Sequence, residues 1–451
     1  MNIIIIGCGE VGETLTRELF EEGNDITVVD LSAERVKSIT EKLDVMGVVG
    51  NGATHTTLIE AGVEKSDLLI SVTESDELNL LCCMIAKKNS NCQVIARVRN
   101  PQYSTEADYL KDELGLAMVI NPEYAVAEEI SRVLRFPAAM QIETFAKGRV
   151  ELLKFKLDGD NVLAGTSVKD MVTKLRCNVL VCTVERGDDV FIPKGNFVFS
   201  ADDIVSVIAS PKSAADFFKK MGYKGHSVKD AIVLGAGSTT HYLASLLKNS
   251  GISLKVIDRD VQKCEELGEA HSELTVINGD ETDQELLLEE GITRTDAFVV
   301  LTQNDEENIL LSLFSKNSGD AKVITKIDRT EYSDIIKHLN LDTPIYPKNI
   351  TADMIARYVR SAKNARGSNV ENMYNFIKGK AEATEFTVKS GSLITDIPLA
   401  EMKLKKDVLI AAILRGGAVI IPRGQDTIKV GDSVVVVSKL LGLHDISEIQ
   451  G

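Results

Sequence analysis

A glycine-rich loop near the amino terminus is the feature of the sequence best suited to chemistry. The aliphatic run 3–6 leads to Gly7, and Gly9 and Gly12 complete the spacing G-x-G-x-x-G before a helix predicted over 13–21. Between a strand and a helix, the first glycine makes a tight turn, the second lets a pyrophosphate approach the backbone, and the third lets the helix pack closely. The free N–H groups of the helix start would then face the phosphates.

Asp30 supplies the carboxylate that such a loop needs. It ends the next predicted strand, 26–30, at about the 20-residue distance that the dinucleotide-binding pattern requires. A carboxylate in this place accepts hydrogen bonds from a ribose 2′-hydroxyl and repels the 2′-phosphate of NADP. The two features together predict an NAD-type site. The alternative is a packing turn between strand and helix that holds no ligand.

The composition indicates the class of protein. The 451 residues are 44% hydrophobic and 26% charged, which is typical of a soluble globular protein with several domains. The net charge of −16 argues against a nucleic-acid partner, because phosphates would be repelled. The seven cysteines form no C-x-x-C pattern and no set with matching histidines, so we expect small buried side chains and no metal site.

Membrane-spanning and secretory signals are missing from the sequence. The amino-terminal residues lack the basic segment and apolar core of a signal peptide. No apolar run approaches the length needed to span a bilayer, and 408–414 is typical of the longest. We therefore expect a cytoplasmic protein that is held at a membrane only by a partner.

Strands and helices alternate strictly through the first part of the chain. After 26–30 the predicted strands are 45–49, 67–72, 93–98 and 117–120, with a helix between each pair. Such alternation predicts right-handed crossovers and a parallel sheet of the Rossmann type. The ligand is expected at the carboxyl edge of that sheet, between its first and fourth strands.

The whole pattern then occurs a second time. Residues 231–237 match 3–9, Asp258 matches Asp30, and the short strands that follow the first lobe also recur. The predicted fold class is α/β, with two tandem Rossmann-type parallel sheets, each followed by a small α+β lobe. The expected domain boundaries are 1–137, 138–225, 226–362 and 363–451.

Two further sets of residues are expected at the carboxyl edge in both copies. Thr73 and Thr302 open a recurrent Thr-x-x-Asp-Glu-x-Asn-like segment after strand four and could contact a ribose or base, whereas its acidic residues are better explained by helix capping. Arg97 and Lys326 lie at the end of strand five, where they could meet a phosphate. Solvated surface charge is the alternative for both.

The second glycine loop departs from the first. It contains Gly235 and Gly237, but Thr240 stands where the third glycine belongs, which puts close helix packing in doubt more than phosphate contact. Arg259 follows Asp258, whereas the first copy has a leucine there, and a guanidinium could attract an additional phosphate. We therefore expect a weaker or altered nucleotide preference in the second copy.

Catalytic groups are not evident in the sequence. None of the six histidines recurs in both copies, and there is no Walker A segment. A Tyr-x-x-x-Lys pair, Tyr374 and Lys378, lies far from strand five of either Rossmann lobe and is interpreted as coincidence. We expect no enzymatic activity, and a soluble NAD-dependent oxidoreductase is the alternative.

Several motifs of the chain resemble those of RCK (KTN) domains. They are the first glycine loop with Asp30, the Gly-Asn-Gly-Ala-Thr turn at 50–54, Thr73-x-x-Asp76-Glu77 and the Arg-Val-Arg segment at 97–99. Each Rossmann lobe with its small lobe is similar to a paired RCK-N and RCK-C unit. Two such copies in one chain resemble the TrkA family of regulatory subunits of Trk potassium-uptake systems.

The resemblance implies a regulator of ion transport. It implies a peripheral protein on the inner face of the cell membrane, bound to a TrkH-type potassium-translocating subunit. It also implies binding of NAD(H) and of ATP or ADP, and assembly into a homotetrameric gating ring in which a change in lobe angle controls the pore. A cytosolic sensor serving another channel or transporter is a further possibility.

The resemblance also assigns nucleotide contacts in both copies. In the first copy they fall on Gly7, Cys8, Gly9, Glu10, Val11, Asp30, Thr73, Glu74 and Val98. In the second copy they fall on Gly235, Ala236, Gly237, Ser238, Thr239, Asp258, Thr302 and Lys326.

Overall fold

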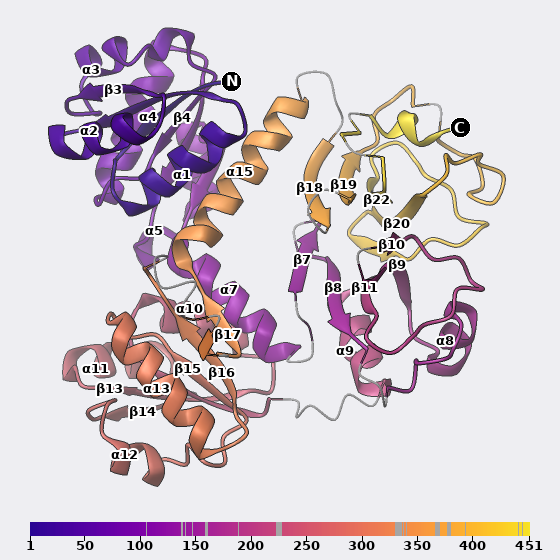
Figure 1. The fold of residues 1–451 in the computed structure, drawn as a ribbon. Helices are drawn as coiled ribbons and strands as arrows, with labels where there is room; N and C mark the ends of the chain where they lie inside the picture. Colours follow the sequence, from indigo (N-terminus) through magenta and orange to yellow (C-terminus); the bar gives the residue numbers. More distant parts are fainter. Residues whose placement is uncertain are drawn as a thin grey trace. The chain divides into compact units, whose positions relative to one another are not determined.

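The chain divides into two compact units, and each unit is built from two segments that are far apart in the sequence (Figure 1). One unit contains Met1–Ser131 with Val228–Ala356, and the other contains Arg132–Ser227 with Arg357–Gly451. This computed structural model describes residues 1–451 except 105, 137, 138, 140, 147, 158–160, 188, 222–227, 330–335, 337, 340, 366–369, 377–379, 393, 441 and 444. The two Rossmann-type lobes therefore belong to one unit and the two small lobes to the other.

The first lobe contains a six-stranded parallel sheet with the order β3-β2-β1-β4-β5-β6. Its strands are β1 (Asn2–Ile6), β2 (Asp25–Asp30), β3 (Met46–Val49), β4 (Leu68–Ser71), β5 (Gln93–Arg97) and β6 (Met118–Ile120). The four isoleucines of β1 are fully buried, as expected for a central strand covered on both faces. The strand order reverses between β1 and β4, which is where a doubly wound sheet binds its ligand.

The helices of the first lobe connect these strands. They are α1 (Glu10–Glu21), α2 (Ala33–Lys42), α3 (His55–Glu60), α4 (Asp76–Asn89), α5 (Pro101–Ser104), α6 (Ala107–Leu114) and α7 (Pro122–Arg135). Helix α1 begins at Glu10, three residues before the predicted start, so the glycine loop leads directly into its first turn. Ser75 caps α4 by accepting the N–H of Leu78, and the acidic Asp76 and Glu77 lie in the first turn of that helix.

The second lobe repeats the same parallel sheet in the order β14-β13-β12-β15-β16-β17. Its strands are β12 (Asp230–Leu234), β13 (Ser253–Asp258), β14 (Thr275–Asn278), β15 (Ala297–Val300), β16 (Lys322–Lys326) and β17 (Thr343–Ile345). Its helices are α10 (Ser238–Leu247), α11 (Val261–Ala270), α12 (Gln284–Glu289), α13 (Asp305–Ser318) and α15 (Pro347–Ala365). The predicted tandem of Rossmann-type sheets is confirmed.

The last helix of each Rossmann lobe contacts the other lobe. At the start of α7, the Asn121 side chain donates a hydrogen bond of 2.9 Å to the Tyr242 hydroxyl, and the Tyr124 ring packs edge-on against that of Tyr242 on α10. At the start of α15, Lys348 forms an ion pair of 2.6 Å with Glu10 on α1, and Figure 1 shows the two helices side by side. In each lobe, the start of the last helix thus contacts the helix that follows the glycine loop of the other lobe.

The second unit contains two five-stranded antiparallel sheets, β10-β9-β11-β8-β7 and β18-β19-β22-β20-β21. The strands of the first are β7 (Gln141–Phe145), β8 (Val150–Lys156), β9 (Val179–Arg186), β10 (Asp189–Phe191) and β11 (Ile204–Ala209). Those of the second are β18 (Val370–Phe376), β19 (Ala381–Thr387), β20 (Val408–Arg415), β21 (Ala418–Ile420) and β22 (Ser433–Ser438). Helices α8 (Val168–Leu175) and α9 (Pro211–Lys220) accompany the first, and one apolar cluster that includes Phe145, Ala383 and Val437 joins both sheets.

All seven cysteines are buried free thiols, which confirms their predicted role. Within the part of the chain that the structure describes, no group of three or more His, Cys, Asp or Glu side chains could hold a metal ion. Within the same residues no helix is long and apolar enough to cross a bilayer.

Candidate functional site

The first candidate site is a cavity of about 1140 Å³ at the carboxyl edge of the first sheet. The glycine loop forms its floor with Gly7, Cys8, Gly9, Glu10 and Val11. The ends of β2, β3, β4 and β5 complete the wall, with Asp30, Gly50, Thr73, Glu74, Arg97 and Arg99 among its residues. The structure therefore brings most of the predicted first-copy residues to one place.

The three glycines of the first loop meet three different requirements. Gly7 has φ of 102°, in the left-handed region that side chains disfavour. A Cβ on Gly12 would lie 1.8 Å from the Gly7 carbonyl oxygen, so helix α1 can approach only with glycine there. A Cβ on Gly9, in contrast, would meet no described atom within 4 Å. Packing within the chain therefore accounts for Gly7 and Gly12 but not for Gly9, whose open face suits the close approach of a ligand.

Asp30 is fixed by two backbone N–H groups. Its Oδ2 accepts the N–H of Cys8 at 2.7 Å, and its Oδ1 accepts that of Ser32 at 2.8 Å. These bonds tie the glycine loop to the end of β2. Each carboxylate oxygen has a second lone pair, so Asp30 can still accept a ribose hydroxyl.

The cavity also contains a buried cation. Arg97 is 8% exposed, and its Nη2 donates to the Thr73 carbonyl, while its Nε has no hydrogen-bond partner among the described residues. Burial, together with the neighbouring Arg99, lowers the pKa of Arg97 below its usual range. Burying a guanidinium is costly unless an anion meets it, so Arg97 favours a negatively charged ligand in this cavity.

Two side chains that the sequence interpretation missed hold this edge in place. The Oδ1 of Asn79 on α4 accepts both the N–H and the hydroxyl of Thr73 at 2.8 Å, and its amide donates to the Arg97 carbonyl. Asp76 accepts the N–H groups of Arg99 and Asn100. The same pattern recurs in the second lobe, so the recurrent spacing was the available signal. Thr73 can offer a ligand only its acceptor lone pairs.

Val98 does not lie where the prediction placed it. Its side chain is fully buried in the core under the first sheet and does not line the cavity. Side chains alternate along a strand, so the flanking Arg97 and Arg99 face the cavity and Val98 faces the core.

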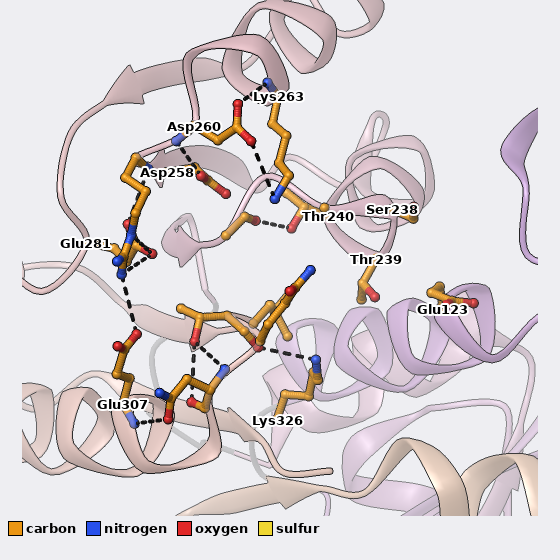
Figure 2. Close-up of a pocket in the computed structure, with 17 residues that line it drawn as sticks. Glu123, Ser238, Thr239, Thr240, Asp258, Asp260, Lys263, Glu281, Glu307 and Lys326 are labelled. Carbon is orange, nitrogen blue, oxygen red and sulfur yellow. Dashed lines mark hydrogen bonds and ion pairs between the residues drawn. The ribbon is translucent and has the colours of Figure 1, made fainter. Parts of the chain in front are cut away.

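The second candidate site is a cavity of about 550 Å³ at the equivalent edge of the second sheet (Figure 2). Gly235, Gly237, Ser238, Thr239, Asp258, Thr302 and Lys326 line it, as predicted, together with Glu123 from α7 of the first lobe. The predicted Ala236 does not line the cavity; its N–H donates to Asp258 Oδ2 at 2.7 Å and its side chain is buried. The second cavity is thus about half as large as the first.

Thr240 replaces the third glycine without breaking the loop. Its buried hydroxyl donates a hydrogen bond of 2.5 Å to the Gly235 carbonyl oxygen. In the first loop, the equivalent carbonyl of Gly7 instead packs closely against Gly12. Gly235 has φ of 104°, as Gly7 has φ of 102°. A Cβ on Gly237 would meet no atom of the described residues within 4 Å. The open face of the second glycine is therefore common to both loops.

Arg259 is held by two acids and does not face the cavity as a free charge. Its Nε donates to Glu281 at 2.9 Å and its Nη2 lies 3.4 Å from Glu307, two acids that Figure 2 labels. The Glu281 carboxylate raises the pKa of Arg259. The expectation that Arg259 attracts an additional phosphate is therefore not supported. Lys326 donates to the Thr302 carbonyl and pairs with Asp328, which leaves it at the wall of the cavity.

Family models match both kinds of lobe. The TrkA-N domain matches residues 3–122 and 231–347, and the TrkA-C domain matches 152–222 and 383–451. The chain is also 33% identical over 456 residues to the Trk system potassium uptake protein TrkA homolog 1 of Methanosarcina mazei, covering 99% of each chain. The chain belongs to the TrkA family.

Solved structures similar to this chain include those of the GsuK channel and of its RCK domain. The GsuK channel bound to NAD has a TM-score of 0.64 and 17% identity, covering 97% of this TrkA-family chain and 76% of that chain. The GsuK RCK domain has a TM-score of 0.62 at 17% identity and covers 97% and 92%. At this identity the likeness establishes the fold alone, and it confirms the predicted RCK-type architecture.

The oxidoreductase alternative is not favoured for this member of the TrkA family. The curated relatives are named as potassium uptake proteins and not as enzymes, in agreement with the expected absence of catalysis. Of the Tyr374 and Lys378 pair, Lys378 lies outside the described residues. His241 on α10 faces His271, with 3.1 Å between Nδ1 and Nε2, and neither lines the second cavity.

Proposed function

We propose that this chain is the peripheral, cytoplasmic regulatory subunit of a potassium-uptake system and gates a TrkH-type membrane subunit in response to NAD(H) and adenine nucleotides. The observation that carries the proposal is the open face of Gly9 beside the start of α1, in one cavity with Asp30 and the buried Arg97. Free N–H groups, a ribose acceptor and a cation are what a dinucleotide requires. Membership of the TrkA family supports the ion-transport role.

The proposed nucleotide contacts follow the cavity walls. In the first cavity they are Gly7, Cys8, Gly9, Glu10, Val11, Asp30, Thr73 and Glu74, with Arg97 replacing Val98. In the second they are Gly235, Gly237, Ser238, Thr239, Asp258, Thr302 and Lys326. We retain 1–137, 138–225, 226–362 and 363–451 as proposed domain boundaries.

The two cavities are proposed to take different nucleotides. The first has room for a dinucleotide, whereas the second has about half the volume and carries Glu123, an acid supplied by the other lobe, at its wall. The Glu123 carboxylate repels phosphates, and a smaller cavity leaves less room for the nicotinamide half. The second cavity therefore suits ADP or ATP, bound more weakly than NAD(H) is in the first.

Gating is proposed to occur by a population shift in a homotetrameric ring. A nucleotide at the start of α1 changes the angle between lobes only if it binds one arrangement more tightly than the other. A differential binding energy of about 1–3 kcal/mol is enough to change channel opening several-fold or more. A nucleotide bound equally by both arrangements would leave the pore unchanged.

Calorimetric titration of NAD, NADH, ADP and ATP into the full chain tests the binding proposal. Asp30→Ala is expected to lose dinucleotide binding, whereas the matched Asp258→Ala keeps it and loses the weaker site. Unchanged dinucleotide affinity in Asp30→Ala would contradict the assignment of the first cavity. Circular dichroism of both variants controls for folding, because each aspartate also holds two backbone N–H groups.

Ion flux tests the regulatory proposal. The chain is reconstituted with a TrkH-type subunit in vesicles, and potassium uptake is measured with each nucleotide. Nucleotide-dependent flux is expected, and flux that is the same with and without nucleotide would refute gating. Mass measurement of the purified chain tests the tetramer, and affinity capture of the membrane partner separates this role from that of a sensor for another transporter.

A further inference from the structure

The first turns of α7 and α15, which each contact the other Rossmann lobe, carry side chains of opposite charge. Lys348 and Glu123 occupy the same place in the two copies, directly after the proline that begins α15 and α7. Lys348 pairs with Glu10 at the start of α1, and Glu123 lines the second cavity beside Thr239 (Figure 2). Each lobe thus places one charged side chain near the glycine loop of the other, and Lys348 does so by pairing with a residue that lines the first cavity.

Lys348 is paired with a side chain from the helix start at which a phosphate is expected. Its partner Glu10 is the first residue of α1 and lines the first cavity, so the ion pair brings a cation close to the wall of that cavity. A cation gains nothing from the dipole at a helix N-terminus, whereas an anion placed there is stabilised. The side chain of Lys348 is only 12% exposed, while that of Glu10 is 74% exposed. The lysine is therefore fixed, and the glutamate can swing into water at little cost.

We propose that Lys348 is a phosphate ligand of the first cavity, supplied by the second lobe, and that Glu10 occupies it when no nucleotide is bound. The inference rests on the proposed binding of a nucleotide in this cavity. An incoming pyrophosphate displaces the Glu10 carboxylate from Lys348 and takes its place between the helix start and the ammonium group. The buried Arg97, whose Nε has no partner among the described residues, provides an independent cation in the same cavity.

The second cavity cannot work in this way because the residue that the other lobe supplies to it is an acid. Glu123 has one oxygen, Oε2, with no hydrogen-bond partner in the part of the chain that the structure describes, and burial raises its pKa. Above that pKa, its negative charge near Ser238 and Thr239 opposes a phosphate. Lys348 and Glu123, each supplied by the other lobe, therefore make the interface between the lobes part of what determines nucleotide specificity. They favour phosphate binding in the first cavity over the second.

Titration of NADH and adenosine into full-length variants tests this inference. Lys348→Met is expected to weaken NADH binding by about tenfold, the loss of one charge-assisted hydrogen bond, and to leave adenosine binding unchanged. Glu10→Gln frees the lysine and is expected to tighten NADH binding several-fold. The double variant should behave like Lys348→Met, because the gain from Glu10→Gln requires the lysine.

Lys42→Met is the matched control. Lys42, the last residue of α2, pairs at 3.0 Å with Glu13, which lines the first cavity from α1 one turn beyond Glu10. Both residues of this pair belong to the first lobe. The substitution is expected to change no affinity by more than about twofold, because the pair is exposed.

Each outcome has one interpretation. If the wild type binds NADH but Lys348→Met binds it equally well, or loses affinity for adenosine to the same degree, the inference is wrong and the proposed function stands. If the wild type binds no nucleotide, the proposed function fails first. A misfolded Lys348→Met cannot mimic success, because misfolding cannot produce the tighter binding expected of Glu10→Gln.

Discussion

The two glycine loops share a backbone and differ in what surrounds it. In both, the first glycine has a φ near 100°, and the N–H of the residue after that glycine donates to the aspartate at 2.7 Å. No side chain or backbone atom of the described residues covers the open face of the second glycine in either loop. In both, an asparagine of the helix after strand four braces the opposite wall. Both copies have therefore kept the backbone arrangement that the proposed phosphate contacts require.

The surroundings of the loops have diverged in size and charge. The first cavity is about twice as large and contains the buried Arg97, whereas the second contains Glu123 and the acids that hold Arg259. We therefore propose that ligand preference is set by side chains at the rim, several of which come from outside the local strand-loop-helix unit. Six substitutions in four tests probe this difference, from the largest expected effect to the smallest.

Gly12→Ala and Thr240→Ala are expected to differ most. A Cβ on Gly12 would clash with the Gly7 carbonyl at 1.8 Å, so the substitution should cost about 3 kcal/mol or more and abolish binding in the first cavity. Thr240→Ala removes one hydrogen bond and should cost about 1 kcal/mol. Denaturant unfolding and NADH titration measure both. Equal losses in the two variants would mean that the third loop position is equivalent in both copies.

Asn79→Leu and Asn308→Leu are expected to lower the free energy of unfolding by similar amounts. Each asparagine bonds the threonine and the strand-five carbonyl of its own lobe from a fully buried position. Leaving those backbone groups unpaired should cost about 2–3 kcal/mol in either lobe, as measured by denaturant unfolding. A large difference between the two would show that the bracing is not conserved in function between the copies.

Glu123→Gln is expected to increase nucleotide affinity in the second cavity. Removing the negative charge should tighten ADP there several-fold. Burial raises the pKa of Glu123, with Asp76 acting in the same direction and Arg97 and Arg99 opposing it. As the pH falls through that raised pKa the acid becomes neutral, so wild-type ADP affinity should increase toward low pH. Calorimetry from pH 5 to 8 should show this slope in the wild type and its loss in Glu123→Gln.

Arg259→Leu is expected to have the smallest effect. The guanidinium is half exposed and already neutralised by Glu281 and Glu307, so its loss should cost about 1 kcal/mol of stability or less. Nucleotide affinity should change by less than about twofold. A tenfold loss of ADP affinity would instead support the sequence-based interpretation, in which Arg259 contacts a phosphate.

The sequence alone determined the local parts of this protein. The glycine spacing, the aspartate that follows it and the second copy of both predicted the parallel sheets and their binding edge, because these depend on contacts between residues close in the chain or on the strict alternation of strands and helices. Capping of α4 by Ser75 was predictable for the same reason.

Only the tertiary structure decided which distant side chains meet. It grouped both Rossmann lobes in one unit, brought Lys348 to Glu10 and Glu123 to the second loop, neutralised Arg259 and turned Val98 into the core. These contacts join residues far apart in the chain, and the orientation of one residue on a strand depends on register. Spacing in the sequence carries no information about either, because charge pairing and side-chain facing are fixed only when the elements pack.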